Sequence, residues 1–272
     1  MTKIQVPSNW APRPYQMPMW DFMENGGKRA VCVWHRRAGK DLCSINWCAV
    51  SALTRPGLYW HLFPTYGQGR KIAWDGMTRD GRKFLDHFPK EMVTAVNNTE
   101  MRLTLSNGSI FQVVGTDNAD RLVGANPVGV VFSEYSIQDP RAWDYIRPIL
   151  AENGGWALFI YTARGRNHGY DLLNVAKRNE SWFQQVLSVE DTRAIPMSAI
   201  DDERAAGMPE EMIQQEFFCS FDAPLVGSYY GNPMAKLLAD GQITKVPYDP
   251  VLEVHTSWDL GIGDSTVILF FQ

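Results

Sequence analysis

Lys40 and Glu134 are the residues of this sequence whose types and surroundings best suit nucleotide hydrolysis. Lys40 follows Gly39 in a short turn between the apolar run 30–34 (AVCVW) and a helical segment. In a strand–turn–helix unit of this kind, the backbone N–H groups of the turn face phosphate groups, and the lysine reaches the β and γ oxygens. The segment therefore predicts a phosphate-binding loop (P-loop).

The turn departs from the usual P-loop pattern, GxxxxGK[ST], at both ends. Trp34 stands at the position of the first glycine, and Asp41 stands where a Ser or Thr is usual. The residues that we expect around the phosphates are Trp34, His35, Arg36, Arg37, Ala38, Gly39, Lys40 and Asp41. A solvated basic turn is the alternative interpretation, because arginine and lysine side chains dominate it.

Glu134 ends the apolar run VGVVFSE. A carboxylate at the end of such a strand is placed to act as a general base on water beside the γ-phosphate. An Asp that supports a Mg²⁺ ion usually precedes this Glu, but here the position is Ser133. The P-loop has gained a carboxylate at Asp41, and the strand has gained a hydroxyl. We therefore expect Asp41 and Ser133 to exchange roles around Mg²⁺; a degenerate, inactive site is the competing interpretation.

The elements that must position these residues alternate short β-rich runs with helical segments, which is typical of an α/β sheet. Strands are predicted at 30–34, 58–63, 101–105, 109–114, 128–132 and 157–161. Helices are predicted at 13–24, at 40–53, after Asp139-Pro140 and at 209–218. Asn107-Gly108 predicts a β-hairpin.

Composition is that of a globular protein, with 45% hydrophobic and 21% charged residues in 272. The net charge of −4 means that contact with nucleic acid would need a local basic face, but it excludes little. The cysteines form no CxxC pair and predict buried structural thiols. The N-terminus lacks the apolar core of a signal peptide, and the uncharged stretch 42–54 is too short to span a bilayer. We therefore expect a soluble protein.

The pattern changes after about Gly207. The segment 220–233 (SFDAPLVGSYYGNP) predicts a connector, and two β runs, 254–260 and 266–271, follow it. The sequence then stops in this second apolar run with nothing for it to pair against, which suggests a truncated second domain. The boundaries that we expect are 1–225 for an ATPase domain, 226–250 for a connector and 251–272 for the first strands of a second domain.

Taken in order, these motifs resemble those of the large terminase subunit, the DNA-packaging motor of tailed bacteriophages, over nearly the whole chain. The resemblance implies a P-loop NTPase core of the ASCE or RecA-like type, with ATP and Mg²⁺ as cofactors. RPYQ at 13–16 resembles the adenine-recognition motif, where Arg13 and Gln16 would lie and Gln16 would contact the base edge. HRRAGKD resembles an Arg-bearing P-loop, which implies a cis-acting charge on the γ-phosphate from Arg37 as first choice and Arg36 as second.

Three further motifs carry the resemblance. FPTYGQ at 63–68 is similar to the Pro-Thr…Gln turn of terminases and related helicases. IYTARGRNHGY at 160–170 resembles the coupling motif, in which Thr162 and Asn167 would sense the γ-phosphate; a Gly-Asn loop with solvated arginines is the alternative. Many members carry an Arg-Gly pair that acts in trans, whereas this chain has Val123-Gly124 there. Arg121 is either that trans charge or an ordinary surface arginine.

The end of the chain, TSWDLGIGDSTVILF, resembles the first strand and turn of the terminase nuclease, which has an RNase H-like fold. Asp259 matches the first ligand of its two divalent metals, Mg²⁺ or Mn²⁺, and Asp264 is a weaker candidate. Because the other ligands would lie beyond Gln272, nuclease activity is implied only for a full-length parent.

The resemblance implies a motor that moves double-stranded DNA into a procapsid. It also implies a homo-oligomeric ring, a pentamer, on the portal protein, a small terminase subunit as partner, and a place in the host bacterial cytoplasm rather than the mature virion. Two alternatives stay open: a helicase-like ATPase of another system, and a nucleotide-binding assembly module with a dead site. Candidate DNA contacts (Arg79, Arg82, Lys83 and Arg102) are scattered, and a solvated face is the better explanation for each of them.

Overall fold

The computed structural model describes residues 10–222, 233–234, 236–237, 240–245, 247–261 and 266–272. The chain divides into two compact units, Met1–Ser228 and Tyr229–Gln272. None of the helices in the described part of the chain has the length and hydropathy needed to span a bilayer.

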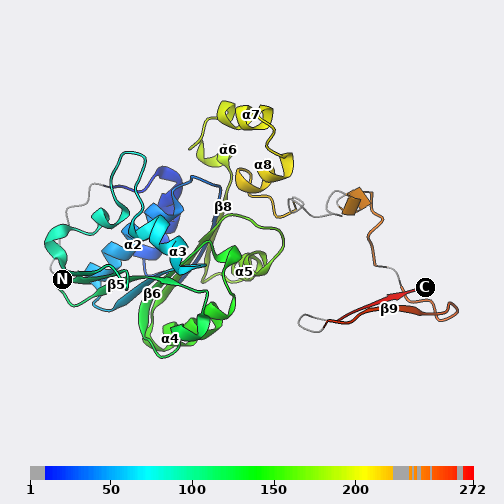
Figure 1. Ribbon diagram of the computed structural model, residues 1–272, viewed down its shortest axis with the longest axis horizontal. Coiled ribbons are helices and arrows are strands. Elements are labelled where there is room, and N and C mark those ends of the chain that lie inside the picture. Colours follow the sequence, from blue (N-terminus) through cyan, green and yellow to red (C-terminus); the bar gives the residue numbers. More distant parts are fainter. Residues whose placement is uncertain (1–9, 223–232, 235, 238–239, 246, 262–265) are drawn as a thin grey trace. The chain divides into compact units, whose positions relative to one another are not determined.

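The first unit is built on an eight-stranded sheet with the order β3-β4-β5-β2-β6-β7-β1-β8 (Figure 1). Its strands are β1 (Arg29–Trp34), β2 (Leu58–Phe63), β3 (Val93–Asn97), β4 (Arg102–Leu105), β5 (Ile110–Gly115), β6 (Pro127–Ser133), β7 (Trp156–Tyr161) and β8 (Phe183–Leu187). In the part β5-β2-β6-β7-β1-β8 of this order, each strand runs parallel to its neighbours. Strands β3 and β4 add an antiparallel edge beside β5. The predicted α/β class with a mainly parallel sheet is confirmed.

Helices cover both faces of this sheet. The helices of this unit are α1 (Met17–Glu24), α2 (Lys40–Thr54), α3 (Tyr66–Gly69), α4 (Arg141–Asn153), α5 (His168–Lys177), α6 (Val189–Thr192), α7 (Met197–Ala205) and α8 (Glu210–Glu216). Of these, α6, α7 and α8 contribute to a separate apolar cluster (Val189, Ile200, Ile213 and Phe217) rather than covering the sheet. Along β1, Ala30 and Cys32 pack with α1 and α2, whereas Val31 and Val33 pack with α4 and α5. A parallel strand buried on both faces needs apolar residues at consecutive positions. This explains why the central strands appear in the sequence as unbroken apolar runs.

The predicted strands and the Asn107-Gly108 hairpin are confirmed, with Gly108 at a φ of +85° between β4 and β5. The four cysteines are free and buried, as expected. Strands β3 and β8 and helices α5 and α7 were not predicted. The run FQQVL of β8 alternates between half-buried and exposed positions at the sheet edge, so it lacks a continuous apolar signal.

The second unit contains β9 (His255–Asp259) and β10 (Val267–Phe271), which pair antiparallel. The expectation that the final apolar run has nothing to pair against is therefore wrong, because it pairs with β9. Asp264 and residues 226–232, 235, 238–239 and 246 of the predicted connector lie outside the described residues. The domain boundaries inferred from the sequence stay a prediction.

Candidate nucleotide-binding site

The turn between β1 and α2, residues 35–39, folds around the ammonium group of Lys40. Nζ donates hydrogen bonds to the carbonyl oxygens of Trp34 (3.0 Å) and His35 (3.4 Å). Arg37 and Gly39 have φ values of +68° and +80°, which make the turn tight enough to bring its ends together. As a result, the Lys40 side chain is only 6% exposed at the start of α2.

Lys40 also contacts residues at the ends of β7, which neighbours β1, and of β6, the next strand beyond β7. Its Nζ donates a 2.9 Å hydrogen bond to Thr162 Oγ1, just after β7, and lies 3.9 Å from Glu134 Oε1, just after β6. Because β6, β7 and β1 are parallel neighbours, their carboxyl ends meet at one edge of the sheet. Ligands of open α/β sheets bind at this edge.

Glu134 has a φ of +54°, in the left-handed region that a side chain rarely occupies. Burial raises the pKa of its carboxyl group. The negative charge of Asp41 raises this pKa further, and the positive charges of Lys40 and Arg164 and a hydrogen bond from the Thr162 backbone lower it, leaving a net rise. A carboxylate with a raised pKa is a stronger proton acceptor, as a general base requires.

Asp41 and Ser133 are brought together from α2 and β6. Ser133 Oγ donates a 2.5 Å hydrogen bond to Asp41 Oδ1, and Nε2 of the fully buried His61 lies 3.6 Å from the same oxygen. Burial raises the pKa of Asp41, but the interactions with His61, Ser133 and Lys40 outweigh it and leave the pKa below its ordinary value. Asp41 is thus held as a carboxylate.

A carboxylate and a hydroxyl side by side are the oxygen ligands that suit Mg²⁺. Mg²⁺ keeps several waters and phosphate oxygens in nucleotide sites, so few protein ligands are needed. The residues present therefore fit a Mg–nucleotide complex.

The 13–16 segment lies against the turn. Gln16 Nε2 donates to the carbonyl oxygen of Ala38 (3.0 Å), and Gln16 Oε1 accepts from the backbone N–H of Arg13 (3.0 Å). Tyr15 Oη also donates to the Ala38 carbonyl oxygen, and it accepts from Arg13 Nη1. The structure thus places Arg13 and Gln16 beside the turn, and both ends of the Gln16 amide bond to backbone.

Two of the predicted residues, Trp34 and His35, contact Lys40 through the backbone rather than through their side chains. Trp34 is fully buried, and its Nε1 donates to Gln185 Oε1 at 3.1 Å. The ring of His35 faces Thr192, 2.6 Å away, and burial lowers the His35 pKa to about 4. Neither ring lies among the polar groups around Lys40. Both residues therefore take part in the site through their carbonyl oxygens, which accept hydrogen bonds from Lys40.

Asn167 stands at the start of α5. Its Oδ1 accepts from the Gly169 N–H (2.9 Å), and its Nδ2 donates to the Ser136 carbonyl oxygen (2.7 Å). Ser136 Oγ in turn donates to the carbonyl oxygen of Thr162 (3.0 Å). Asn167 therefore fixes the loop after β7 to the segment that follows Glu134.

Two further sequence candidates belong to other elements of the chain. Arg121 belongs to the 3₁₀ helix Ala119–Leu122, and its side chain lies outside the described residues. Asp259 ends the exposed strand β9 of the second unit. The roles inferred for both stay predictions.

Sequence reasoning missed four residues of the site: His61, Gln138, Arg164 and Glu216. His61 could have been noticed as a polar residue inside the apolar run LYWHLF. Gln138 is buried, and its Nε2 donates to the carbonyl oxygens of Leu62 and Ser133. Glu216 carries no such signal, because its importance depends on a contact across 180 residues of sequence.

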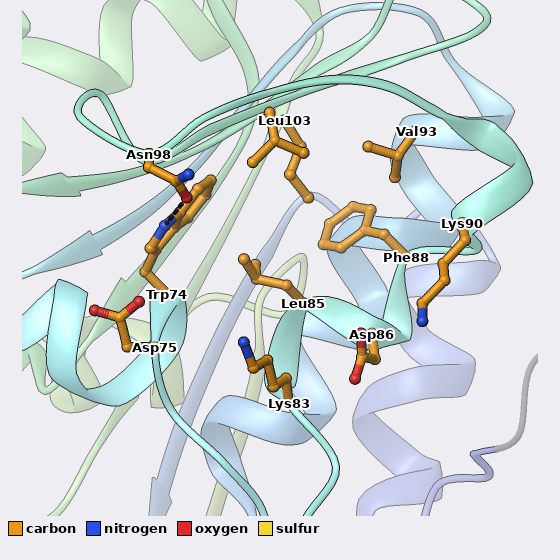
Figure 2. A pocket seen from close by; sticks show the side chains of 11 residues that line it. Trp74, Asp75, Lys83, Leu85, Asp86, Phe88, Lys90, Val93, Asn98 and Leu103 are labelled. Carbon is orange, nitrogen blue, oxygen red and sulfur yellow. Dashed lines mark hydrogen bonds between the residues drawn. The ribbon is translucent and has the colours of Figure 1, made fainter.

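A separate cavity of about 380 Å³ lies on the same unit (Figure 2). Its lining is partly apolar, with Trp74, Leu85, Phe88 and Leu103 among the apolar residues. The charged residues of the lining are Asp75, Lys83, Asp86 and Lys90. None of its lining residues comes from the turn or from the strand ends around Lys40. The mixed charges agree better with a solvated face than with a basic DNA contact.

No protein-family model and no curated protein sequence matches the chain. Solved structures do match. The ATPase domain of the large terminase of Thermus phage P74-26 superposes with a TM-score of 0.65 at 20% identity, covering 78% of this chain and 94% of that one. The large terminase of a second thermophilic bacteriophage, in complex with ATP-γ-S, superposes with a TM-score of 0.61 at 12% identity.

The match to the ATP-γ-S complex covers 94% of this chain but 63% of the other chain, so this chain spans less than two thirds of that protein. At these identities the likeness shows the fold. The chain shares its fold with these two terminase structures.

Proposed function

We propose that the chain is the ATPase part of a phage large terminase, a motor that hydrolyses ATP to move double-stranded DNA into a procapsid. The observation that carries the proposal is the convergence of Lys40, Glu134 and the Asp41–Ser133 pair at the carboxyl ends of neighbouring parallel strands. The fold supports it, since two terminases share that fold and one of them binds ADP and ATP-γ-S.

In this proposal the backbone of the turn and the Lys40 ammonium hold the β- and γ-phosphates. Asp41 and Ser133 hold the Mg²⁺ ion, which neutralises phosphate charge when bound. Thr162 orients the Lys40 ammonium through its 2.9 Å hydrogen bond. An arginine of the turn, Arg37 or Arg36, adds positive charge at the γ-phosphate.

Glu134 orients the attacking water and accepts its proton. The water oxygen forms a bond to phosphorus as the bond to the β,γ-bridging oxygen breaks, and the products are ADP and phosphate. The raised pKa of Glu134 favours this proton transfer. Lys40, 3.9 Å away, stabilises the carboxylate before it takes up the proton.

The remaining parts of the proposal rest on the sequence resemblance. They are a pentameric ring on the portal protein, a small terminase subunit as partner, action in the cytoplasm of the host, a trans-acting role for Arg121, and Asp259 as one ligand of a nuclease that a longer parent would complete. The helicase-like ATPase and the nucleotide-binding module remain the competing functions.

Phosphate release from ATP, measured by malachite green with and without double-stranded DNA, tests the proposal. We expect Mg²⁺-dependent release that Glu134→Gln abolishes, and no strand separation of a forked duplex. Strand separation would favour the helicase-like function. Binding of ATP-γ-S without release of phosphate from ATP under any condition would favour the binding module.

A further inference from the structure

Glu216, the last residue of α8, is a buried carboxylate that the ATPase mechanism does not use. Its side chain is 3% exposed. Arg164 Nη1 lies 2.7 Å from Oε1, and Arg36 Nη1 lies 3.4 Å from Oε2. Gln215 Nε2 also donates to Oε1 at 3.3 Å. A buried carboxylate needs such partners, because an unpaired charge in the interior is costly.

The two arginines come from the two loops that border the nucleotide site. Arg36 lies in the turn 35–39, and its backbone N–H donates a 2.7 Å hydrogen bond to the Glu216 carbonyl oxygen. Arg164 lies in the loop after β7, two positions beyond Thr162, and its charge lowers the pKa of Glu134. Glu216 therefore joins α8 to both loops.

The two ion pairs differ in strength. The Arg164 side chain is 30% exposed and its contact is short, whereas the Arg36 side chain is 63% exposed and its contact is long. Exposed ion pairs contribute little, so Arg36 can leave Glu216 at small cost. Arg164 alone can neutralise the carboxylate, which leaves the Arg36 guanidinium available to another anion.

Resting on the proposed function, we propose that Glu216 is an internal competitor of the nucleotide for Arg36. Glu216 holds the guanidinium at the edge of the site until the terminal phosphate of ATP takes it, and Arg164 remains paired with the carboxylate. A triphosphate draws Arg36 more strongly than a diphosphate because it carries more negative charge. Glu216 is thus a positioning residue that sets how strongly the site distinguishes ATP from ADP.

Nucleotide affinity tests this role, measured by competition of ATP-γ-S and ADP with a fluorescent ADP at fixed Mg²⁺. Glu216→Gln keeps the shape and an acceptor oxygen for Arg164 but removes the competing charge. We expect ATP-γ-S to bind on the order of fivefold more tightly than to the wild type, and ADP to change less. Glu210→Gln is the matched control, because Glu210 is an exposed glutamate of the same helix that pairs with Arg204 instead.

Arg36→Gln provides a second test that does not disturb the pairing of Glu216 with Arg164. We expect it to weaken ATP-γ-S binding more than ADP binding. Combined with Glu216→Gln, it should also remove the tighter ATP-γ-S binding that Glu216→Gln produces alone. If Glu216→Gln does not fold, as judged by circular dichroism, the ratio of ATP-γ-S affinity to ADP affinity in Arg36→Gln decides the question alone.

Unchanged or weaker ATP-γ-S binding by folded Glu216→Gln would overturn the inference, as would equal losses for both nucleotides in Arg36→Gln. A wild-type protein that binds neither nucleotide would instead overturn the proposed ATPase, and the inference would fall with it.

Discussion

Ser133 donates a 2.5 Å hydrogen bond to Asp41, although one residue ends β6 and the other stands in the first turn of α2. In the usual arrangement the P-loop carries the hydroxyl and the strand carries the carboxylate. This chain has the two groups in reverse. The pair still places one hydroxyl and one carboxylate side by side, the same two kinds of oxygen donor as in the usual arrangement.

The exchange predicts the outcome of a double substitution. Asp41→Ala is expected to lower Mg²⁺-dependent phosphate release by about 100-fold, because it removes a ligand of the ion, and the loss of a residue that only supports a ligand already costs about 10- to 100-fold. Asp41→Ser combined with Ser133→Asp restores both groups in the usual order and should recover part of the activity. Release is measured by malachite green at several Mg²⁺ concentrations. Full activity of Asp41→Ala would end the hypothesis that the two residues share the ion.

The fold was largely predictable because its central strands are buried on both faces. Every residue of β6 and β7 is buried, so both strands appear as apolar runs. The edge strands β3 and β8 were missed for the opposite reason, since each keeps part of its surface in solvent. A run of apolar residues predicts a strand only where the strand is buried on both faces, so partly exposed strands are missed.

The site was predictable where neighbours in sequence form it and unpredictable where the fold brings distant residues together. Gly39, Lys40 and Asp41 were placed in a phosphate-binding turn by their position between an apolar run and a helical segment. The roles of His61 and Glu216 could not be predicted, because a polar residue in a strand or at the end of a helix acquires its role only from what packs against it. Their contacts with Asp41 and Arg36 exist only after the sheet and α8 have formed.

Glu134→Gln separates binding from hydrolysis. The amide keeps the size of the side chain but cannot accept a proton from water, so phosphate release should fall by about 100-fold or more. Binding of ATP-γ-S should persist, because the turn and Lys40 are unchanged. Glu152→Gln, an exposed position on α4, serves as the matched control and should behave as the wild type. Equal loss of binding and release in Glu134→Gln would argue against its assignment as the base.

The two side-chain hydrogen bonds of Asn167 predict that replacing this residue lowers the stability of the fold. Its Oδ1 caps α5 and its Nδ2 holds the Ser136 carbonyl oxygen, so Asn167→Ala loses both hydrogen bonds. We expect a fall of about 1 kcal/mol in the free energy of unfolding from the lost cap alone. Asn167→Asp keeps a capping oxygen and should be less destabilised. Urea denaturation measures both, and equal stability of the wild type and Asn167→Ala would contradict the role.

The raised pKa of Glu134 predicts the acid side of the pH–rate profile. The base is active as a carboxylate, so release should fall about tenfold per pH unit once the pH drops below this pKa. Because burial raises the pKa, that fall should begin at a higher pH than for an ordinary glutamate. Arg164 opposes the rise through its positive charge, so Arg164→Ala should move the acid limb to still higher pH. Arg166→Ala is the control, since Arg166 lies in the same loop but pairs with Asp222 at 2.6 Å. Single-turnover rates of the wild type and the two variants across the pH range give these profiles. If Arg164→Ala did not shift the acid limb, a group other than Glu134 would control it.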